Sequence, residues 1–562
     1  MTLSTAPQSS SPVTLQQLIA VCGSDDSNPT NRNRQHALQT LLLSVSSVEN
    51  IPFQHFCLDS RQLKPSDIFV LLKSHIPNCQ RSRDYLYQAA QQAAFILSEI
   101  DPIALLSKAT APPHSNIQLT TDNAQAIAQQ QLDALPCPVS YVPDIRDFLG
   151  SLIQARMQFQ KTVALPTVVA VTGTNGKTTI SQLVAQLTQL TGLSSAVMGT
   201  AGNGRLGELV QASHTTGDAL AVQQFLYQMG TQNAELLALE ASSHGLDQQR
   251  LQGVPVSVAI YTNLSRDHLD YHADMAEYAS AKAKLFDKAH FPDLTHAIIN
   301  IDDEHAQIML DTAHASDLTV WTYSLNPSNT ATFVAADIKP SLQGVEITLR
   351  TDFGHKTADN ITIISPLLGR FNVANLLAAM AAAVALGLDL ERIADAVPQL
   401  QGAVGRMERV PSNEGCFIVD YAHTPDALSQ VLASLKTHCK GQLWAVFGCG
   451  GDRDAGKRPL MAQAGLTGAD KVVLTADNPR TEDPNSILQD MQSGMTSEQY
   501  QRSHIEPARQ TAIEYAVNHA AADDIVVIAG KGHESYQEIN HVRYDFDDRV
   551  VLHNALKQAG RV

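Results

Sequence analysis

The chain has 562 residues, an ordinary hydrophobic content of 44% and a formal net charge of −17. This length exceeds what one hydrophobic core usually organises and predicts about three or four domains. The negative charge argues against a protein that binds nucleic acid without regard to sequence, because no excess of basic residues is present to neutralise phosphates.

The N-terminal segment, the cysteines and the apolar stretches indicate the cellular compartment of the protein. Residues 1–18 are polar and lack the basic and apolar segments of a secretory signal. The seven cysteines are scattered without CxxC spacing, which fits a reducing environment better than disulfides or a zinc site. The most apolar stretch, 376–388, is too short to span a bilayer. We therefore expect a cytoplasmic protein without membrane insertion.

The first region, residues 1–159, carries weak signals of a small α/β domain. Apolar runs at Ile68–Leu72 and Ala94–Leu97 predict two strands. Residues 101–136 are rich in Gln, Ala, Pro and Ser, which indicates a surface insertion with one helix.

The second region, residues 160–401, opens with a phosphate-binding motif. A β-branched run leads into Gly173-Thr-Asn-Gly-Lys-Thr-Thr179, and a helical pattern follows toward Leu190. Glycines let backbone N–H groups face one concavity, while the helix N-terminus, a lysine and a hydroxyl can bind phosphate and Mg²⁺. Val171 stands where a standard motif has glycine, and the alternative is a plain glycine-rich turn. The positions of Lys177 and Thr178 favour a nucleoside triphosphate site.

The rest of the second region alternates strands with helices, as a doubly wound sheet does. Strands are predicted at Leu236–Leu239, Val256–Tyr261 and His296–Asn300, and residues 332–364 predict a small antiparallel sheet.

Two polar motifs directly follow two of these strands. Glu240-Ala-Ser-Ser-His-Gly-Leu246 places a carboxylate, a hard oxygen ligand suited to Mg²⁺, at a strand end. Thr262-Asn-Leu-Ser-Arg-Asp-His-Leu-Asp-Tyr-His272 gathers acidic and histidine side chains. Alone this second motif could be a solvated loop, but beside a phosphate site it indicates metal or phosphate binding.

The third region, residues 402–562, predicts a second parallel, Rossmann-like sheet. Its strands are expected at Phe417–Val419, Leu443–Phe447, Val472–Thr475 and Ile525–Ile528. Glycine and proline follow these strands, and ligands of such sheets bind at the carboxyl ends of the strands. We expect loops there to face the phosphate-binding motif across a cleft.

Six motifs occur in the order typical of the Mur ligases, and the chain resembles that family from residue 58 to its end. These enzymes catalyse ATP-dependent formation of amide bonds in cytoplasmic peptidoglycan synthesis. The resemblance implies an N-terminal UDP-sugar-binding domain, a central ATP-binding domain and a C-terminal amino-acid-binding domain. The motifs are the three quoted above, Gly369-Arg-Phe-Asn-Val-Ala-Asn375, Asp420-Tyr-Ala-His-Thr-Pro425 and Gly530-Lys-Gly-His-Glu534.

Asp477-Asn-Pro-Arg480 resembles the signature of family members that add meso-2,6-diaminopimelate as the third residue of the stem peptide. Diaminopimelate has a second zwitterionic centre, whose carboxylate a guanidinium can bind through two hydrogen bonds. Lysine offers only an ammonium at that place and would be repelled. Without the other motifs, the same residues would be interpreted as a turn with a surface arginine.

The resemblance also implies roles in catalysis and in nucleotide binding. Lys177, Glu240, His268 and Lys282 would be catalytic, and Thr178, Glu240, His268 and Lys282 would bind Mg²⁺. Lys282 falls where the family carries a carbamylated lysine, formed when a neutral amine adds CO₂. The ATP-binding set is Gly173, Thr174, Asn175, Gly176, Lys177, Thr178, Thr179, Asn372, Arg406 and Asp420.

The two other substrates have their own implied sets. The chain departs from the family at His214, where relatives often have asparagine, and at His75–Gln80, which does not resemble the usual glycine-rich uridine loop. UDP-N-acetylmuramoyl-L-alanyl-D-glutamate would contact Leu58, Ser60, His214, Thr215, Thr216, Ser242, Gln248 and Arg250. Diaminopimelate would contact Arg453, Asp477, Asn478, Pro479, Arg480, Gly530 and Glu534.

The implied reaction passes through an acyl phosphate, formed by the D-glutamyl carboxylate and ATP and then attacked by the amine of diaminopimelate. We expect a monomer in which the C-terminal domain closes before reaction. The enzyme alternatives are a lysine-adding relative and a folyl-polyglutamate synthase-like ligase. The alternative from another class is a nucleotide-binding regulatory protein that has lost turnover.

Overall fold

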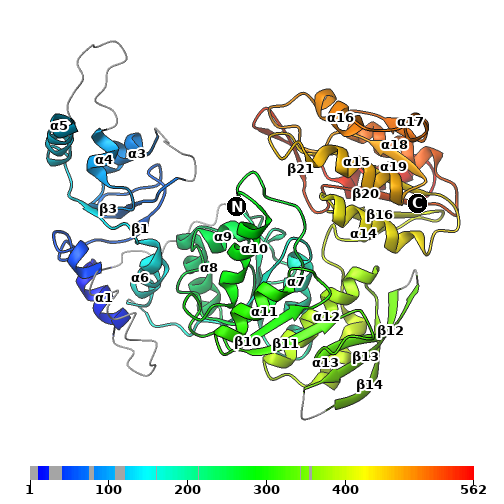
Figure 1. Ribbon diagram of the computed structural model, residues 1–562, viewed down its shortest axis with the longest axis horizontal. Helices are drawn as coiled ribbons and strands as arrows, with labels where there is room; N and C mark the ends of the chain where they lie inside the picture. Colours follow the sequence, from blue (N-terminus) through cyan, green and yellow to red (C-terminus); the bar gives the residue numbers. More distant parts are fainter. Residues whose placement is uncertain are drawn as a thin grey trace.

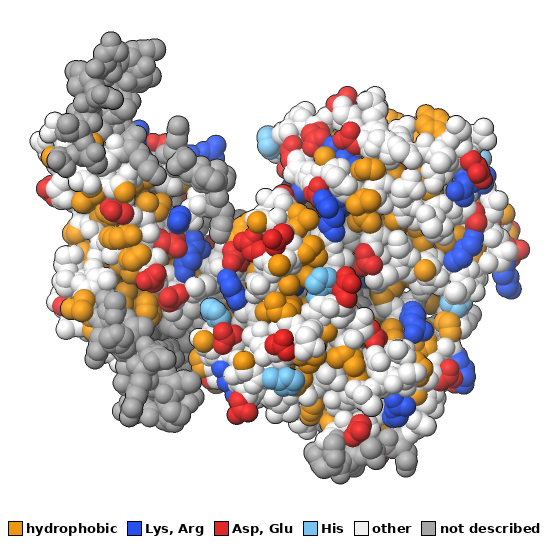
Figure 2. Space-filling model, viewed as in Figure 1, with side chains coloured by type: hydrophobic (Ala, Val, Ile, Leu, Met, Phe, Trp, Pro, Cys, Tyr) orange, Lys and Arg blue, Asp and Glu red, His pale blue; other side chains and the backbone are white. Residues whose placement is uncertain are grey.

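The computed structural model describes residues 11–23, 41–74, 81–107, 121–159, 161–212, 214–341, 344–353 and 357–562. Figure 1 shows three parts, each built around its own sheet, with the central part lying between the N-terminal and C-terminal parts. The α/β fold class is thereby confirmed, while the boundaries at residues 159 and 401 stay a prediction. In Figure 2 a deep recess separates the two outer parts.

The N-terminal part contains a four-stranded parallel sheet, whose order follows the chain. Both predicted strands are confirmed. The strands are β1 (Phe56–Cys57), β2 (Ile68–Leu71), β3 (Phe95–Ser98) and β4 (Val139–Tyr141), and the helices of this part include α1 (Leu15–Gly23), α3 (Arg81–Ala90) and α6 (Arg146–Gln158).

The stretch 101–136 differs from its prediction. It holds two helices instead of one, α4 (Pro102–Ser107) and α5 (Thr121–Asp133), while residues 108–120 lie outside the described part. Leu106 and Ala128 are buried in one core with residues of β2 and β3, so the stretch covers the sheet. This packing could not be predicted from the sequence, because small alanine side chains give only a weak apolar pattern.

The central part holds a ten-stranded sheet in the order β14-β13-β12-β11-β10-β9-β5-β8-β6-β7. β5 lies between β8 and β9, so the motifs that follow these three parallel strands meet at one edge. Strands β12 to β14 are antiparallel as predicted, but β11 and β12 pair and join them to the main sheet. The strands are β5 (Thr167–Thr172), β6 (Ser195–Gly199), β7 (Gly202–Gly204), β8 (Leu236–Glu240), β9 (Val256–Tyr261), β10 (His296–Asn300), β11 (Thr319–Ser324), β12 (Phe333–Ser341), β13 (Gly344–Asp352) and β14 (Thr357–Ser365).

Helices cover both faces of this sheet. α7, α12 and α13 share one core with the sheet, and α8, α10 and α11 share the other. The apolar stretch 376–388 begins in the buried helix α12, and no helix of the described residues could cross a membrane. The helices are α7 (Lys177–Leu190), α8 (Ala219–Thr231), α9 (Ser243–Asp247), α10 (Met275–Ala283), α11 (Ala306–Ala315), α12 (Arg370–Ala385) and α13 (Leu390–Ala396), with 3₁₀ turns at Lys284–Phe286 and Val397–Gln399.

The C-terminal part contains a six-stranded sheet in the order β15-β16-β20-β17-β18-β19 and a separate hairpin. All four predicted strands are confirmed. The strands are β15 (Glu408–Val410), β16 (Cys416–Asp420), β17 (Leu443–Phe447), β18 (Lys471–Leu474), β19 (Ser503–Ile505), β20 (Ile525–Ala529), β21 (Tyr536–Ile539) and β22 (Val542–Asp545). The helices are α14 (Pro425–Lys436), α15 (Lys457–Gly468), α16 (Pro484–Gln492), α17 (Ser497–Gln501), α18 (Arg509–His519) and α19 (Asp548–Gln558).

A buried ion pair joins α18 to α19 beneath the ends of β18 and β20. Arg509 donates to both carboxylate oxygens of Asp548, at 2.8 and 2.7 Å, and to the carbonyl oxygen of Ala529 at 2.8 Å. We expect Arg509→Met to lower the free energy of unfolding of this part by about 3–5 kcal/mol, because Asp548 stays buried without a counter-charge. Chemical denaturation would measure it. Arg509→Met with Asp548→Leu should recover most of the loss, and a single variant as stable as the wild type would contradict the expectation.

Candidate active site

The phosphate-binding loop joins β5 to α7 and is held from β9. Gly173 has a φ of +150°, and a Cβ there would lie 1.8 Å from Thr262 Oγ1. Thr262 Oγ1 donates to the carbonyl oxygen of Asn175 at 2.6 Å, while Asn175 N donates to Asn263 Oδ1 at 2.9 Å. Only glycine fits at Gly173, so the loop keeps a fixed shape beside β9.

Two lysine ammonium groups meet at one backbone carbonyl of this loop. Lys177 Nζ donates to Gly173 O at 2.8 Å, and the buried Lys282 Nζ donates to the same oxygen at 2.9 Å. Lys282 Nζ also lies 4.4 Å from the centre of the Tyr278 ring. Desolvation and the neighbouring Lys177 lower the pKa of Lys282 well below its ordinary value. The lowered pKa makes the neutral, unprotonated form of the Lys282 amine easier to reach than for an exposed lysine.

Glu240 ends β8 inside the cavity wall and is only 1% exposed. Its Oε1 accepts from Thr200 N at 2.8 Å and its Oε2 from Thr200 Oγ1 at 3.0 Å. A Cβ at Gly199 would lie 2.1 Å from Oε1, so glycine is needed for this approach. The carboxylate is thus held near the loop by fixed donors.

His268 and Asp267 follow β9 and face the C-terminal part. His268 has a φ of +55°, and its Nε2 lies 3.6 Å from Asp267 Oδ2. Desolvation lowers the pKa of His268 and outweighs the attraction of Asp267, so the ring is neutral at about pH 7. His423, which follows β16, also lies 3.9 Å from Asp267 Oδ2.

A cavity of about 490 Å³ lies between the central and C-terminal parts. It brings together most of the predicted site residues, although they come from positions more than 300 residues apart. The predicted residues that line it are Thr174, Asn175, Gly176, Lys177, Thr178, His214, Thr215, Thr216, Glu240, Ser242, Arg250, His268, Lys282, Arg406, Arg453, Asp477, Asn478, Arg480, Gly530 and Glu534.

Arg480 belongs to the cavity wall formed by the C-terminal part. Its φ is +50°, and its Nη1 donates to Gly451 O at 2.7 Å, which fixes the side chain. Its Nε lies 3.7 Å from Glu538 Oε2. Asn478, two residues earlier, donates from Nδ2 to Glu534 Oε2 at 2.9 Å. The wall therefore presents a guanidinium and carboxylates side by side.

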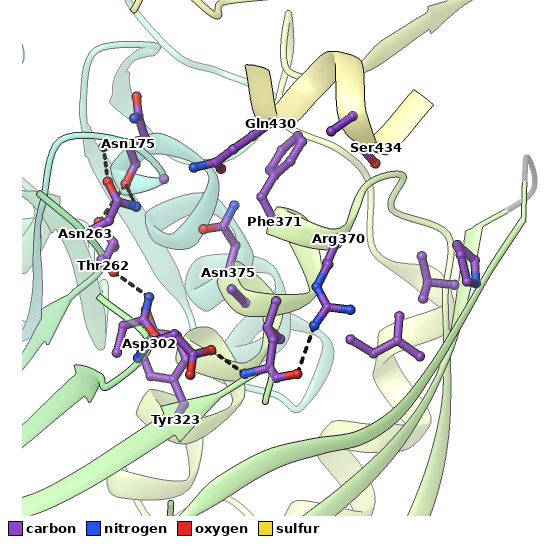
Figure 3. A pocket seen from close by; sticks show the side chains of 18 of the residues that line it. Asn175, Thr262, Asn263, Asp302, Tyr323, Arg370, Phe371, Asn375, Gln430 and Ser434 are labelled. Atoms are coloured by element: carbon purple, nitrogen blue, oxygen red, sulfur yellow. Dashed lines mark hydrogen bonds between the residues drawn. The ribbon is translucent and has the colours of Figure 1, made fainter. Parts of the chain in front are cut away.

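A second pocket of about 560 Å³ adjoins the phosphate loop and shares Asn175 and Gly176 with the first (Figure 3). Its walls come from β10 to β13, α12 and α14, so both parts contribute. Sequence reasoning missed this pocket. Two features of the sequence could have indicated it: the polar residues 302–305 after β10, and Asn375, the second asparagine of the motif that forms the start of α12. Missed lining residues include Thr262, Asn263, Asn300, Asp302, Arg370, Phe371 and Asn375.

Eight predicted residues do not line the first cavity. Asn372 donates to Leu368 O at 2.7 Å and accepts from Asn375, which lines the second pocket in its place. Asp420 accepts from the backbone of Met407 and Ala422. Gly173, Thr179 and Pro479 are also not among the lining residues. Gln248 accepts from Arg250 Nε and Nη2, Ser60 donates to Gln88, and Leu58 packs on the N-terminal core.

Direct contacts hold the C-terminal part against the phosphate loop. Arg266 and Asp454 form an ion pair at 3.3 Å, and Asn175 Nδ2 donates to Asp426 Oδ2 at 3.4 Å. Arg406 Nη2 donates to Thr178 Oγ1 at 3.4 Å. The two parts are therefore docked in this conformation.

No group of three His, Cys, Asp or Glu side chains in the described part of the chain is arranged to hold a metal ion. Mg²⁺ at a nucleotide needs fewer protein ligands, because phosphates and waters supply the others. Thr178 and Glu240 offer the hard oxygen donors such an ion takes, and both line the cavity.

Two family models match the chain, described as the Mur ligase middle domain at residues 171–383 and as the Mur ligase, glutamate ligase domain at residues 405–532. A relative from Vibrio vulnificus, named UDP-N-acetylmuramoyl-L-alanyl-D-glutamate–2,6-diaminopimelate ligase, is 39% identical over 90% of this chain and 95% of its own. A solved structure of the same name is 41% identical at a TM-score of 0.64 and covers 98% of this chain and 100% of its own. Folylpolyglutamate synthase of Mycobacterium tuberculosis, at 18% identity and a TM-score of 0.54 over 67% of this chain and 91% of its own, shares the fold alone.

Proposed function

Because this chain belongs to the Mur ligase family, we propose that it joins meso-2,6-diaminopimelate to UDP-N-acetylmuramoyl-L-alanyl-D-glutamate with cleavage of ATP. One observation carries the proposal: the phosphate loop of Lys177 and the guanidinium of Arg480 line the same cavity. The reaction supplies peptidoglycan precursors in the cytoplasm. One chain provides all three binding regions, so the enzyme acts as a monomer.

ATP binds across the two pockets. Its phosphates lie on the loop that begins at Gly173, and its base and ribose occupy the second pocket beside Phe371 and Asn375. Mg²⁺ would be held by Thr178 and Glu240, with His268 as a further ligand, and carbamylated Lys282 would hold a second Mg²⁺. When bound, Mg²⁺ neutralises charge that develops on the phosphoryl group.

The muramoyl dipeptide approaches from the N-terminal part along the loops after β8. Thr216 Oγ1 donates to Glu240 O at 2.7 Å and accepts from Ser242 N at 3.0 Å. Arg250 Nη1 donates to Thr216 O at 2.9 Å. These bonds hold Thr215, Thr216 and Ser242 toward the cavity, where they position the substrate.

The chain catalyses the reaction by positioning and charge neutralisation. The D-glutamyl carboxylate forms a bond to the γ-phosphorus of ATP while the bond to the bridging oxygen breaks and releases ADP. Lys177 stabilises the charge on the transferred group. The amine of diaminopimelate, oriented by Arg480 and Glu534, then attacks the acyl carbon, and phosphate leaves. The docked C-terminal part keeps water from the acyl phosphate.

The acyl phosphate predicts a positional isotope exchange. With ATP carrying ¹⁸O in the β–γ bridge and the UDP-dipeptide present, we expect the label to move to a non-bridging β position without diaminopimelate. The reason is that formation of ADP frees the β-phosphate to rotate before the step reverses. Nuclear magnetic resonance of the recovered ATP measures this exchange, and omission of the UDP-dipeptide is the control. A label that stays in the bridge would contradict the intermediate.

A substrate panel separates the alternatives. Diaminopimelate, lysine and glutamate are offered with ATP and the UDP-dipeptide, and the product is identified by mass spectrometry. We expect a product with diaminopimelate alone. A product with lysine in its place would indicate the lysine-adding specificity, and no phosphate release with any of them would indicate a regulatory protein.

A further inference from the structure

Lys531 lies inside the wall that carries Arg480, and no step above uses it. Its side chain is 0% exposed. Its Nζ donates to Asn478 Oδ1 at 3.1 Å and to Glu534 Oε2 at 3.2 Å, and it lies 3.7 Å from Asp477 Oδ1. The Tyr536 ring centre is 5.5 Å away. A buried ammonium is retained only where nearby groups compensate its lost hydration, and here two carboxylates do so.

The charges around this lysine do not cancel. Asp477 and Glu534 carry two negative charges and Lys531 one positive charge, and both carboxylates reach the cavity. Asp477 Oδ1 is buried and has no hydrogen-bond partner among the described residues. Together these three side chains hold one excess negative charge and one unused acceptor, which suit a single ammonium group of a ligand.

We propose that Lys531 is a positioning residue that keeps Asp477 and Glu534 ionised together, so that the Glu534 carboxylate can pair with the ammonium at the remote centre of the amino-acid substrate. The inference rests on the proposed function and deepens it. Burial and Asp477 raise the pKa of Glu534, whereas Lys531 and Asn478 lower it. Without the ammonium, two adjacent buried carboxylates would share a proton, and the protonated acid could no longer pair with the substrate.

The other charged or titratable groups near Glu534 are already engaged. Arg509 is paired with Asp548, and Arg480 donates to Gly451 O. Neither can take the place of the lysine. The charged or titratable groups that interact with Glu534 are Asp477 after β18, Lys531 in its own loop, Arg509 of α18, Tyr421 after β16 and Tyr536 of β21, and Arg480 lines the same cavity.

Lys531→Met removes the charge and keeps most of the side-chain length. At neutral pH we expect the KM for meso-diaminopimelate to rise roughly 30-fold or more, with the KM values for ATP and the UDP-dipeptide nearly unchanged. The ratio of variant to wild-type KM should fall as the pH is raised above neutral, because burial and Asp477 raise the pKa of Glu534 without an opposing ammonium, and Glu534 loses its proton as the pH rises. Using the ratio cancels the titration of the substrate itself. Lys531→Arg, which keeps the charge, should restore part of the affinity.

The double variant Lys531→Met with Asp477→Asn leaves Glu534 as the one carboxylate of this group, so Glu534 stays ionised without the lysine. We expect its KM ratio to be independent of pH, because Glu534 no longer has a like charge beside it. A Lys531→Met enzyme with wild-type KM, or with an elevated KM that ignores pH, would overturn the inference. Loss of ATP binding in both the Lys531→Met and the double variant would also overturn the inference, because it would show that Lys531 is needed for folding. A wild-type enzyme that does not ligate diaminopimelate would instead refute the proposed function.

Discussion

Lys282→Ala is expected to lower kcat at least about 100-fold, while binding of the UDP-dipeptide changes little. Lys282 is buried, its Nζ has a backbone carbonyl as its hydrogen-bond acceptor, and Lys177 shares that oxygen. These surroundings favour the neutral amine, which forms a carbamate when its nitrogen bonds to CO₂ and releases a proton. The product is an anionic oxygen ligand beside the phosphate loop.

Short carboxylic acids test the role of that anion. Acetate or propionate should restore part of the activity of Lys282→Ala, because a free carboxylate can enter the space left by the side chain. Lys288→Ala is the control, since Lys288 donates to Asp317 O at the surface and should leave kcat unchanged. Wild-type turnover of Lys282→Ala, or loss of activity that no acid restores, would speak against the carbamate.

Arg480→Ala is expected to raise the KM for meso-diaminopimelate by a factor that corresponds to about 2–5 kcal/mol, roughly 30-fold or more. The guanidinium is fixed by Gly451 O and lines the cavity with its side chain only 22% exposed, so its pair with the remote carboxylate is partly shielded from solvent. Arg480→Lys should lose most of the same affinity, because an ammonium cannot form two parallel hydrogen bonds. Initial-rate kinetics with each substrate varied in turn measure the effect.

The Arg480→Ala variant should also discriminate less well against lysine as the amino-acid substrate. Removing Arg480 removes the repulsion of a terminal ammonium as well as the attraction of a carboxylate. Arg543→Ala is the matched control, because Arg543 is exposed and its guanidinium carbon lies 4.2 Å from the centre of the Tyr536 ring. An unchanged KM for diaminopimelate in Arg480→Ala would remove the proposed basis of specificity.

Local patterns were sufficient to predict the phosphate loop and the strands in the middle of each sheet, but not strands such as β1, β4, β6, β7, β11, β15 and β19. The β-branched run and the glycine turn predicted the start of α7 at Lys177, where the helix does begin. Strand ends were predicted well because buried parallel strands are continuous apolar runs bounded by glycine or polar residues. Helix α5 was less visible, because alanine side chains make its contacts.

Residues that act through distant contacts could not be predicted from their own surroundings in the sequence. Lys282 lies on an ordinary helical pattern, and only the resemblance to a family distinguished it. Asn372 and Asn375 share one motif, but a helix turns about 100° per residue, so a single position decides which amide reaches the pocket. The second pocket requires β10, α12 and α14 to meet, and no local pattern encodes that meeting.

The pocket of Figure 3 is walled by the central part and by α14 of the C-terminal part. A compound bound between Phe371 and Ser434 would contact both the central and the C-terminal part. It would therefore bind more tightly when the two parts are docked. Such a compound would hold the two parts together and would occupy the place proposed for the base and ribose of ATP. Accumulating ATP would therefore relieve its inhibition, while the contact with α14 would add affinity that a compound bound to the central part alone lacks.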